Sequence, residues 1–307
     1  MMMTPILEWV MFGAIVVIML AFDLWVFHRK AHVITMKEAL AFSAMWIALA
    51  LLFNFGLYLS DGYDVALKFF TGYLIEKSLS VDNLFVFYMI FAYFKTPPEH
   101  QYKVLFWGIL GALVMRAIFI SAGVTLIATL HWTIYVFGAF LIITGIKLAF
   151  QKEQQLQPER NLALRMFRKV FRVTPEYHGD KFLIREAGAL IATPLLVTLI
   201  VIETTDLVFA TDSIPAILGI TTDPFIVYSS NIFAILGLRA LYFVLAGLMD
   251  LFRYLHYGLA IVLVFIGGKM VAENWIEIPI GISLGIVAGV LIVSIVISLL
   301  RRESKEA

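Results

Sequence analysis

Long apolar stretches separated by short polar connections are the dominant pattern along this chain. A helix needs about 20 mostly apolar residues to cross the roughly 30 Å hydrocarbon core of a bilayer. The stretches suited to this cover residues 6–27, 39–59, 65–94, 104–128, 132–150, 187–218, 225–249, 255–272 and 278–300. The pattern therefore predicts an all-α, polytopic membrane protein with nine transmembrane helices, in which residues 1–307 form a single transmembrane domain.

Basic residues gather in alternate connections between these stretches. They are Arg29, Lys30, Lys37, Lys95, Lys103, Arg253, Arg301, Arg302, Lys305 and the Lys and Arg residues of the loop 151–186. The intervening connections 61–64, 129–133 and 220–224 contain neither Lys nor Arg. Because Lys and Arg accumulate on the cytoplasmic side of a membrane, we expect the N-terminus outside the cell and the C-terminus in the cytoplasm.

The loop 151–186 is the one sizeable polar segment that the pattern predicts. Apolar residues such as Leu164, Phe167 and Phe171 alternate there with basic residues, which predicts a cytoplasmic amphipathic helix. Such a helix can lie on the anionic inner leaflet of the membrane, which is the interpretation we favour. The alternative is a binding site for a regulatory protein.

Composition excludes several classes of function. Apolar residues make up 62% of the 307 residues and charged residues 15%, against about 45–50% and about 25% in soluble domains, so a water-soluble enzyme is excluded. A net charge of +1 offers no basic face for nucleic acid. The absence of cysteine excludes disulfides, thiolate metal sites and iron–sulfur clusters. We expect membrane lipid as a partner, and neither enzymatic activity nor a prosthetic group.

Two parts of the chain repeat the same sequence pattern. Residues 76–83 (EKSLSVDN) and 206–213 (DLVFATDS) both contain an acid, five further residues, Asp, and then a small polar residue. Glycine and basic residues then recur in the same order, at 111–117 and 237–240, and at 145–147 and 267–269. The repeated units enter the membrane from opposite sides, so the third to fifth predicted helices form an inverted repeat with the sixth to eighth. Secondary transporters commonly have this arrangement.

Acidic residues lie inside the predicted helices, where a charge is costly. Insertion of an Asp or Arg at a helix centre costs roughly 2.5–3.5 kcal/mol. The acids of the repeated segments are Glu76, Asp82, Glu203, Asp206 and Asp212. Arg116 and Arg239 can neutralise at most two of them, and Lys77 a third. The remainder is a negative site that suits one divalent cation, although a carboxylate could hold a proton instead.

Oxygen atoms are the only ligands that this region offers. Asn83 and Ser213 add to the five carboxylates, and hard oxygen donors suit Mg²⁺, Ca²⁺ or Mn²⁺. Pro194 and Pro215 could break the helix 187–218 beside the acids, because proline removes a backbone hydrogen bond.

Three further charged residues keep more than one interpretation. Asp23 could be an accessory ligand, a proton site or the partner in a hydrogen bond between helices. Arg116 and Arg239 could be gates, or structural ion-pair partners of the acids in the repeated segments.

The two acidic segments resemble the signatures of a known family. Residues 76–83 and 203–216 (ETTDLVFATDSIPA) are similar to the two motifs of the TerC family of integral membrane proteins, and are closest to its Alx branch. The resemblance implies a multi-pass protein of the cell inner membrane, linked to alkaline pH response, tellurium resistance and metal-ion homeostasis, with manganese export as the leading activity. It also implies that the family's acidic residues correspond to the five carboxylates named above.

Three functions stay open at this point. The first is a manganese exporter, whose metal-site residues are Glu76, Asp82, Asn83, Glu203, Asp206, Asp212 and Ser213, with Glu203 either binding metal or relaying protons. The second follows the family label of a membrane-bound redox modulator. The third is a scaffold for tellurium or stress resistance that recruits a complex through the loop 151–186.

Overall fold

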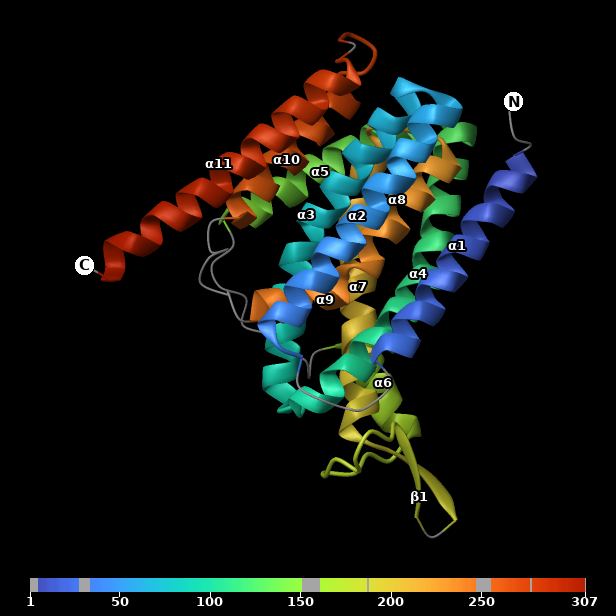
Figure 1. The fold of residues 1–307 in the computed structure, drawn as a ribbon, viewed down its shortest axis with the longest axis vertical. Coiled ribbons are helices and arrows are strands. Elements are labelled where there is room, and N and C mark those ends of the chain that lie inside the picture. Colours follow the sequence, from blue (N-terminus) through green and yellow to red (C-terminus); the bar gives the residue numbers. More distant parts are fainter. Residues whose placement is uncertain are drawn as a thin grey trace.

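The computed structural model describes residues 5–27, 34–150, 161–186, 188–246, 255–276 and 278–306. Within them lie helices α1 (Pro5–Phe27), α2 (Met36–Asp61), α3 (Tyr63–Phe94), α4 (Pro98–Thr129), α5 (Thr133–Phe150), α6 (Leu162–Val170), α7 (Pro194–Leu218), α8 (Pro224–Leu236), α9 (Leu238–Ala246), α10 (Leu255–Val271) and α11 (Ile280–Glu306). Strands β1 (Leu183–Glu186) and β2 (Ala189–Ala192) form an antiparallel hairpin. The long helices gather in one bundle and the hairpin projects from one end, which we call the hairpin end (Figure 1).

The helical, membrane-spanning character of the chain is confirmed. Six helices of the described residues, α1, α2, α4, α5, α7 and α11, are long and apolar enough to cross a membrane, and α8 with α9 makes a seventh span if the bent pair is counted as one. The other two predicted stretches are helical but do not meet that standard. Helix α10 has 17 residues within the described part of the chain, and α3 carries Lys68, Glu76, Lys77 and Asp82 along its 32 residues.

The helix that carries the second acidic segment begins later and is more regular than its sequence suggests. The predicted stretch 187–218 starts as strand β2, and α7 begins at Pro194, where a proline costs nothing because the first helical N–H has no partner in the helix. Pro215 lies inside α7, which continues to Leu218. The expected breaks at Pro194 and Pro215 are therefore wrong.

A real break occurs one helix later, at Gly237. Helices α8 and α9 meet there at an angle of 41°, so the predicted helix 225–249 is a bent pair. The amino group of Lys77 lies 2.6 Å from the position that a Cβ atom of Gly237 would occupy. It donates a hydrogen bond to the carbonyl oxygen of Ala234, at 3.2 Å. A glycine at the bend therefore makes room for a half-buried lysine from α3.

The loop after α5 contains a short helix, as predicted, and a hairpin that the sequence analysis missed. Helix α6 begins after Asn161, whose side chain accepts a hydrogen bond from the backbone N–H of Leu164 at 3.1 Å. Lys103 of α4 forms an ion pair with Asp180, at 2.8 Å, and this hydrogen bond holds the pKa of the Asp180 carboxyl below its usual value. The polar segment is thus fixed to the helix bundle.

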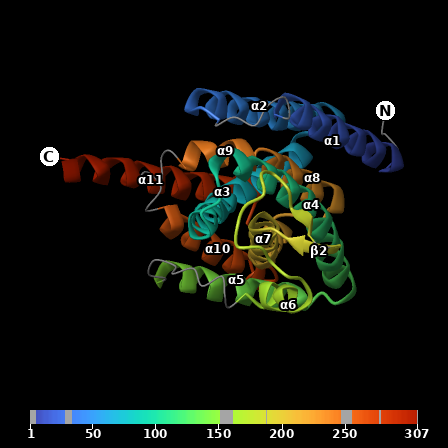
Figure 2. The same cartoon turned by 90° about the horizontal axis from the view of Figure 1, so that it is seen from below.

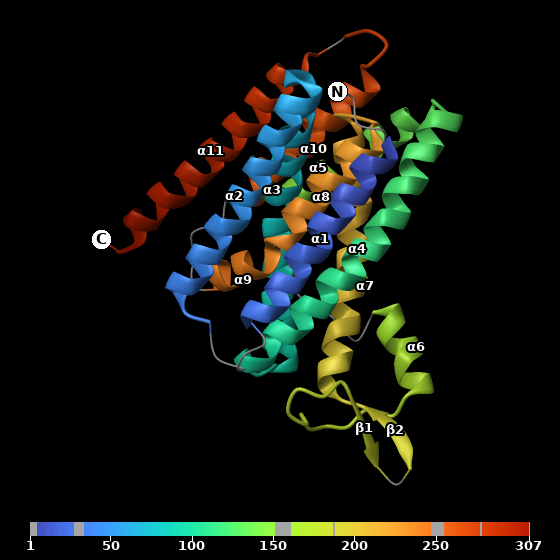
Figure 3. The same cartoon turned by 45° about the vertical axis from the view of Figure 1, so that its right-hand side comes forward.

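Helices α3, α4, α7 and α8 form the centre of the bundle. Helix α3 packs against both α7 and α8, and α4 packs against the same two helices. Helices α1 and α2 lie on one side of this centre and α5 on the other (Figure 2). Helix α3 runs toward the hairpin end, whereas α7 runs away from it, and α6 lies beside the first part of α7 (Figures 1 and 3). The two acidic segments are thus on adjacent helices of opposite direction.

Glycines bring α5 and α10 into close contact. A Cβ atom on Gly138 would lie 2.8 Å from the carbonyl oxygen of Gly267, and one on Gly145 would lie 2.7 Å from that of Ala260. As the residue number rises along α5, its partner's number on α10 falls, so the two helices are antiparallel. Close backbone packing at small residues is a common way for helices to associate in membranes.

We predict that Gly138→Ala destabilises the protein by about 1–3 kcal/mol, because its methyl group would meet backbone atoms of α10 that cannot easily move. The matched control is Gly268→Ala, where an added Cβ meets nothing within 4 Å, and where we expect a change within about 0.5 kcal/mol. Unfolding of the purified protein in detergent measures both. Equal effects of the two substitutions would contradict the packing described here.

Candidate functional site

Arg116 of α4 connects the two acidic segments. It is 1% exposed, and its guanidinium contacts both Glu76 of α3 and Asp206 of α7. Its Nε donates to Oδ2 of Asp206 and its Nη2 to Oδ1, each at 3.3 Å, so this contact is bidentate. Nη1 donates to Oε1 of Glu76 and, at 3.4 Å, to the hydroxyl of Ser213. Three of the predicted site residues therefore meet on one arginine.

This cluster is deeply buried, which sets its energetics. Glu76 is 0%, Asp206 5% and Ser213 2% exposed. Desolvating charges in such a place costs several kcal/mol for each ion, and the cost is recovered only through close pairing and hydrogen bonds. Arg116 carries one positive charge against two carboxylates, so the cluster keeps a formal charge of −1 when both acids are ionised. Oε2 of Glu76 has no hydrogen-bond partner within the described structure.

Glu203 lies on the same helix as Asp206, three residues closer to the hairpin end. Its carboxylate sits directly over Gly111 of α4, where an added Cβ atom would overlap with Oε1 of Glu203. Its Oε2 is buried and has no hydrogen-bond partner among the described residues. The next residue, Thr204, accepts a hydrogen bond from the amide of Asn161 at 2.7 Å, so the start of α6 is attached to α7 beside this acid.

The remaining three predicted ligands lie farther along α3 and α7. Asp82 is six residues beyond Glu76, and Asp212 is six beyond Asp206, or about 9 Å along each helix axis. Because α3 and α7 run in opposite directions, Asp82 lies toward the hairpin end and Asp212 toward the opposite end (Figure 1). Asp212 is half-buried. Asn83 is 3% exposed.

The predicted residues are therefore spread along the bundle. Glu76, Asp206 and Ser213 meet at Arg116, whereas Asp82 and Asp212 stand on either side of them. Within the described parts of the chain, no group of three or more His, Cys, Asp or Glu side chains is placed to hold a metal ion. The metal site stays a prediction, and its ligands would have to converge through a rearrangement.

Two of the expected countercharges go elsewhere. Arg239 forms an ion pair with Asp23 of α1, and Lys77 donates to a backbone carbonyl. In this structure Arg116 pairs with an acid of each repeated segment, as one interpretation expected, and Arg239 pairs with Asp23; a gating role of either arginine stays a prediction. Sequence reasoning kept Asp23 apart because it lies outside the repeat. In the sequence, Gly111 is visible only as part of the repeat. In the structure, the carboxylate of Glu203 packs against Gly111.

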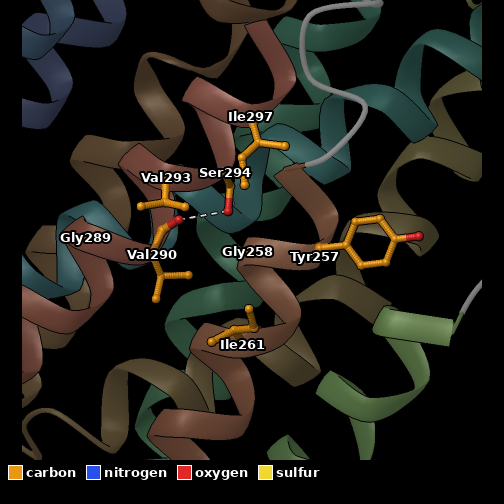
Figure 4. Close-up of a pocket in the computed structure, with 8 residues that line it drawn as sticks. All are labelled: Tyr257, Gly258, Ile261, Gly289, Val290, Val293, Ser294 and Ile297. Atoms are coloured by element: carbon orange, nitrogen blue, oxygen red, sulfur yellow. Dashed lines mark hydrogen bonds between the residues drawn. The ribbon is translucent and has the colours of Figure 1, made fainter. Parts of the chain in front are cut away.

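A larger hollow elsewhere contains no carboxylate. It has a volume of about 360 Å³ and lies between α10 and α11, where Val290, Val293 and Ile297 line it (Figure 4). Ser294 also lines it, and its hydroxyl donates to the carbonyl oxygen of Val290 at 2.8 Å. With no charged residue in its lining, this groove is separate from the acidic site.

We predict that Arg116→Gln lowers the free energy of unfolding by about 3–5 kcal/mol, because it leaves two buried carboxylates without their cation. The matched control is Lys147→Gln, which removes one positive charge from an exposed position of α5 and should change stability by no more than about 0.5 kcal/mol. Denaturant unfolding in detergent measures both. A loss at Arg116 no larger than that at Lys147 would show that the pairing is unimportant for stability.

Comparison with known proteins agrees with the resemblance of the motifs. Residues 61–306 match the pattern of the integral membrane protein TerC family. The chain is 53% identical to a membrane protein of Myxococcus xanthus, over 95% of this chain and 92% of the relative. It is 50% identical to "Putative membrane-bound redox modulator Alx" of Salmonella typhi and 49% identical to the protein of that name in Escherichia coli K12, in both cases over 96% of this chain and 94% of the relative. No solved structure matches. With more than two thirds of its length matched in this way, the chain belongs to the TerC family of integral membrane proteins.

Proposed function

We propose that this protein is a transporter that exports a hard divalent cation, Mn²⁺ above all, across the cell inner membrane. The observation that carries the proposal is the set of Asp82, Glu203 and Asp212. They lie on bundle helices of a membrane protein, and no Lys or Arg of the described residues forms an ion pair with them. Uncompensated carboxylates at membrane depth are costly and are typical of ion pathways.

The order of these acids along the bundle supports a path for the cation. Asp82 and Glu203 lie toward the hairpin end, Asp212 toward the opposite end, and the Arg116 cluster between them. A cation that arrives from the hairpin end would meet the first two, and would pass the centre only if it replaced Arg116 there. Arg116 then acts as the cation that occupies the site when no metal is bound.

The packing supports the inverted repeat on which alternating access depends. In the inverted repeat, α3 corresponds to α7, α4 to the α8–α9 pair, and α5 to α10. The contact between α3 and α8 should then have a counterpart between α7 and α4. Both contacts are present. The antiparallel contact of α5 with α10 joins the last helices of the two units. The six spans, the bent pair, α3 and α10 together account for nine crossings, with the basic connections and the hairpin end in the cytoplasm.

The identity of the ion rests on ligand chemistry and on the family resemblance together. Carboxylates, an amide and a hydroxyl are oxygen ligands, which suit Mn²⁺, Mg²⁺ and Ca²⁺. The resemblance to the TerC family favours manganese among them. The protein would then contribute to metal and alkaline-pH homeostasis as a transporter and not as an enzyme.

A second candidate function follows from the names of the relatives, which describe a membrane-bound redox modulator. The chain has no cysteine, so such a role requires a bound electron carrier or a redox-active metal. Manganese itself has more than one oxidation state, so metal export could also change the redox balance of a cell.

We predict that the purified protein in liposomes moves Mn²⁺ toward a metal-sensitive dye trapped inside, and that Asp212→Asn reduces the rate at least tenfold, because it removes a carboxylate from the far end of the path. The matched control is Glu99→Gln, an exposed acid near the start of α4, which should transport at the normal rate. Equal rates for the two variants would refute the assignment of Asp212.

The redox alternative predicts a different result from the same preparation. A bound flavin or haem would give a visible absorption band, whereas a pure cation transporter would show none. A stoichiometric chromophore together with no flux of Mn²⁺ would favour the redox role and overturn our main proposal.

A further inference from the structure

A second buried ion pair lies near the acidic cluster, between Asp23 of α1 and Arg239 of α9. Asp23 is 3% and Arg239 2% exposed. The guanidinium of Arg239 also stacks over the ring of Tyr102, with its Cζ 4.1 Å from the ring centroid. The hydroxyl of Tyr102 donates to the backbone oxygen of Asp23, at 3.3 Å. The pair is therefore fixed from three helices.

Arg116 and Arg239 correspond in the repeat, yet they have different partners. Arg116 holds Glu76 and Asp206, the first acids of the two repeated segments, whereas Arg239 holds Asp23, which lies outside the repeat. In a transporter built from an inverted repeat, the two units exchange conformations between the two states. The two arginines have different partners here, as expected for one of the two states of such a transporter.

A small cavity connects Arg239 to Asp206. Both residues line it, together with Gly108 and Ala112 of α4 and Ile202 of α7. Its volume of about 20 Å³ is enough for a single water molecule. Gly108 and Ala112 are the small residues of this lining, beside the guanidinium of Arg239 and the carboxylate of Asp206. Leu84, Phe87 and Leu238 also line the cavity, so Arg239 reaches the acid only if the helices that carry these bulky side chains shift.

We propose that Arg239 and Arg116 alternate as the partner of Asp206, and that Asp23 is the residue that holds Arg239 away from it in the state described here. In the opposite state Arg239 crosses the cavity to Asp206, and Arg116 releases the acids. This inference rests on the proposed transport function, and it makes Asp23 a positioning residue of the transport cycle. The pattern of the TerC family covers only residues 61–306, so α1 supplies this control from outside the matched segment.

The proposal predicts an unusual dependence between two substitutions. Arg116→Gln alone leaves Asp206 without a cation, because Asp23 retains Arg239. Adding Asp23→Asn releases Arg239 to pair with Asp206, so the double variant should unfold about 3 °C or more above Arg116→Gln alone. Asp23→Asn by itself should lower the unfolding temperature. Thermal unfolding of the full-length protein in detergent measures all three and does not depend on any flux of Mn²⁺.

Two controls separate this exchange from a merely structural ion pair. Asp23→Glu keeps the carboxylate and should give no rescue of Arg116→Gln, and adding Arg239→Gln to the double variant should abolish the rescue. If Arg116→Gln fails to accumulate, the proposal requires that Asp23→Asn restore folded protein. A double variant that is no more stable than Arg116→Gln, or that also fails to accumulate, would overturn the proposal. Rescue without Mn²⁺ flux in the unmodified protein would reject the transport function and leave the exchange between the arginines standing.

Discussion

The contact of Arg116 with Glu76 and Asp206 is the interaction on which the rest of the structure depends. It joins α3, α4 and α7 at the centre of the bundle, in a position where unpaired charges would be costly. The apolar helices around it can pack in many ways, since membrane helices gain little from burying apolar surface against one another. A buried arginine with two carboxylates specifies one arrangement, because only one register brings the three groups together.

The same contact bears on the proposed metal site, because no group of three or more His, Cys, Asp or Glu side chains of the described residues is placed to hold a metal ion. The guanidinium occupies the place between the two acidic segments, so Glu76 and Asp206 cannot also approach a metal ion. A cation that bound to these two acids would therefore have to compete with the side chain of Arg116. Under the proposed transport function, this competition would couple the binding of the ion to a movement of the helices that carry the three groups. Asp23 and Arg239 form a second buried ion pair, nearer the hairpin end.

Much of the architecture could be predicted from the sequence, since each apolar stretch corresponds to a helix or to a bent pair of helices. The acidic segments, Arg116 and the amphipathic helix α6 were also visible there. The partner of Arg239 was not, because α1 approaches α9 only in three dimensions and Asp23 lies outside the repeat. The helix breaks were misplaced because Pro194 begins a helix, Pro215 lies near the end of one, and the bend at Gly237 depends on Lys77 from another helix.

The central claim is that the carboxylates left without a cation beside the Arg116 cluster bind a transported metal. Equilibrium binding of Mn²⁺ to the purified protein, followed by the electron paramagnetic resonance signal of the free ion, tests it most directly. We expect about one Mn²⁺ bound per chain, and the loss of this binding in a variant that combines Asp82→Asn, Glu203→Gln and Asp212→Asn. Undiminished binding by that variant, or no binding by the unmodified protein, would contradict it.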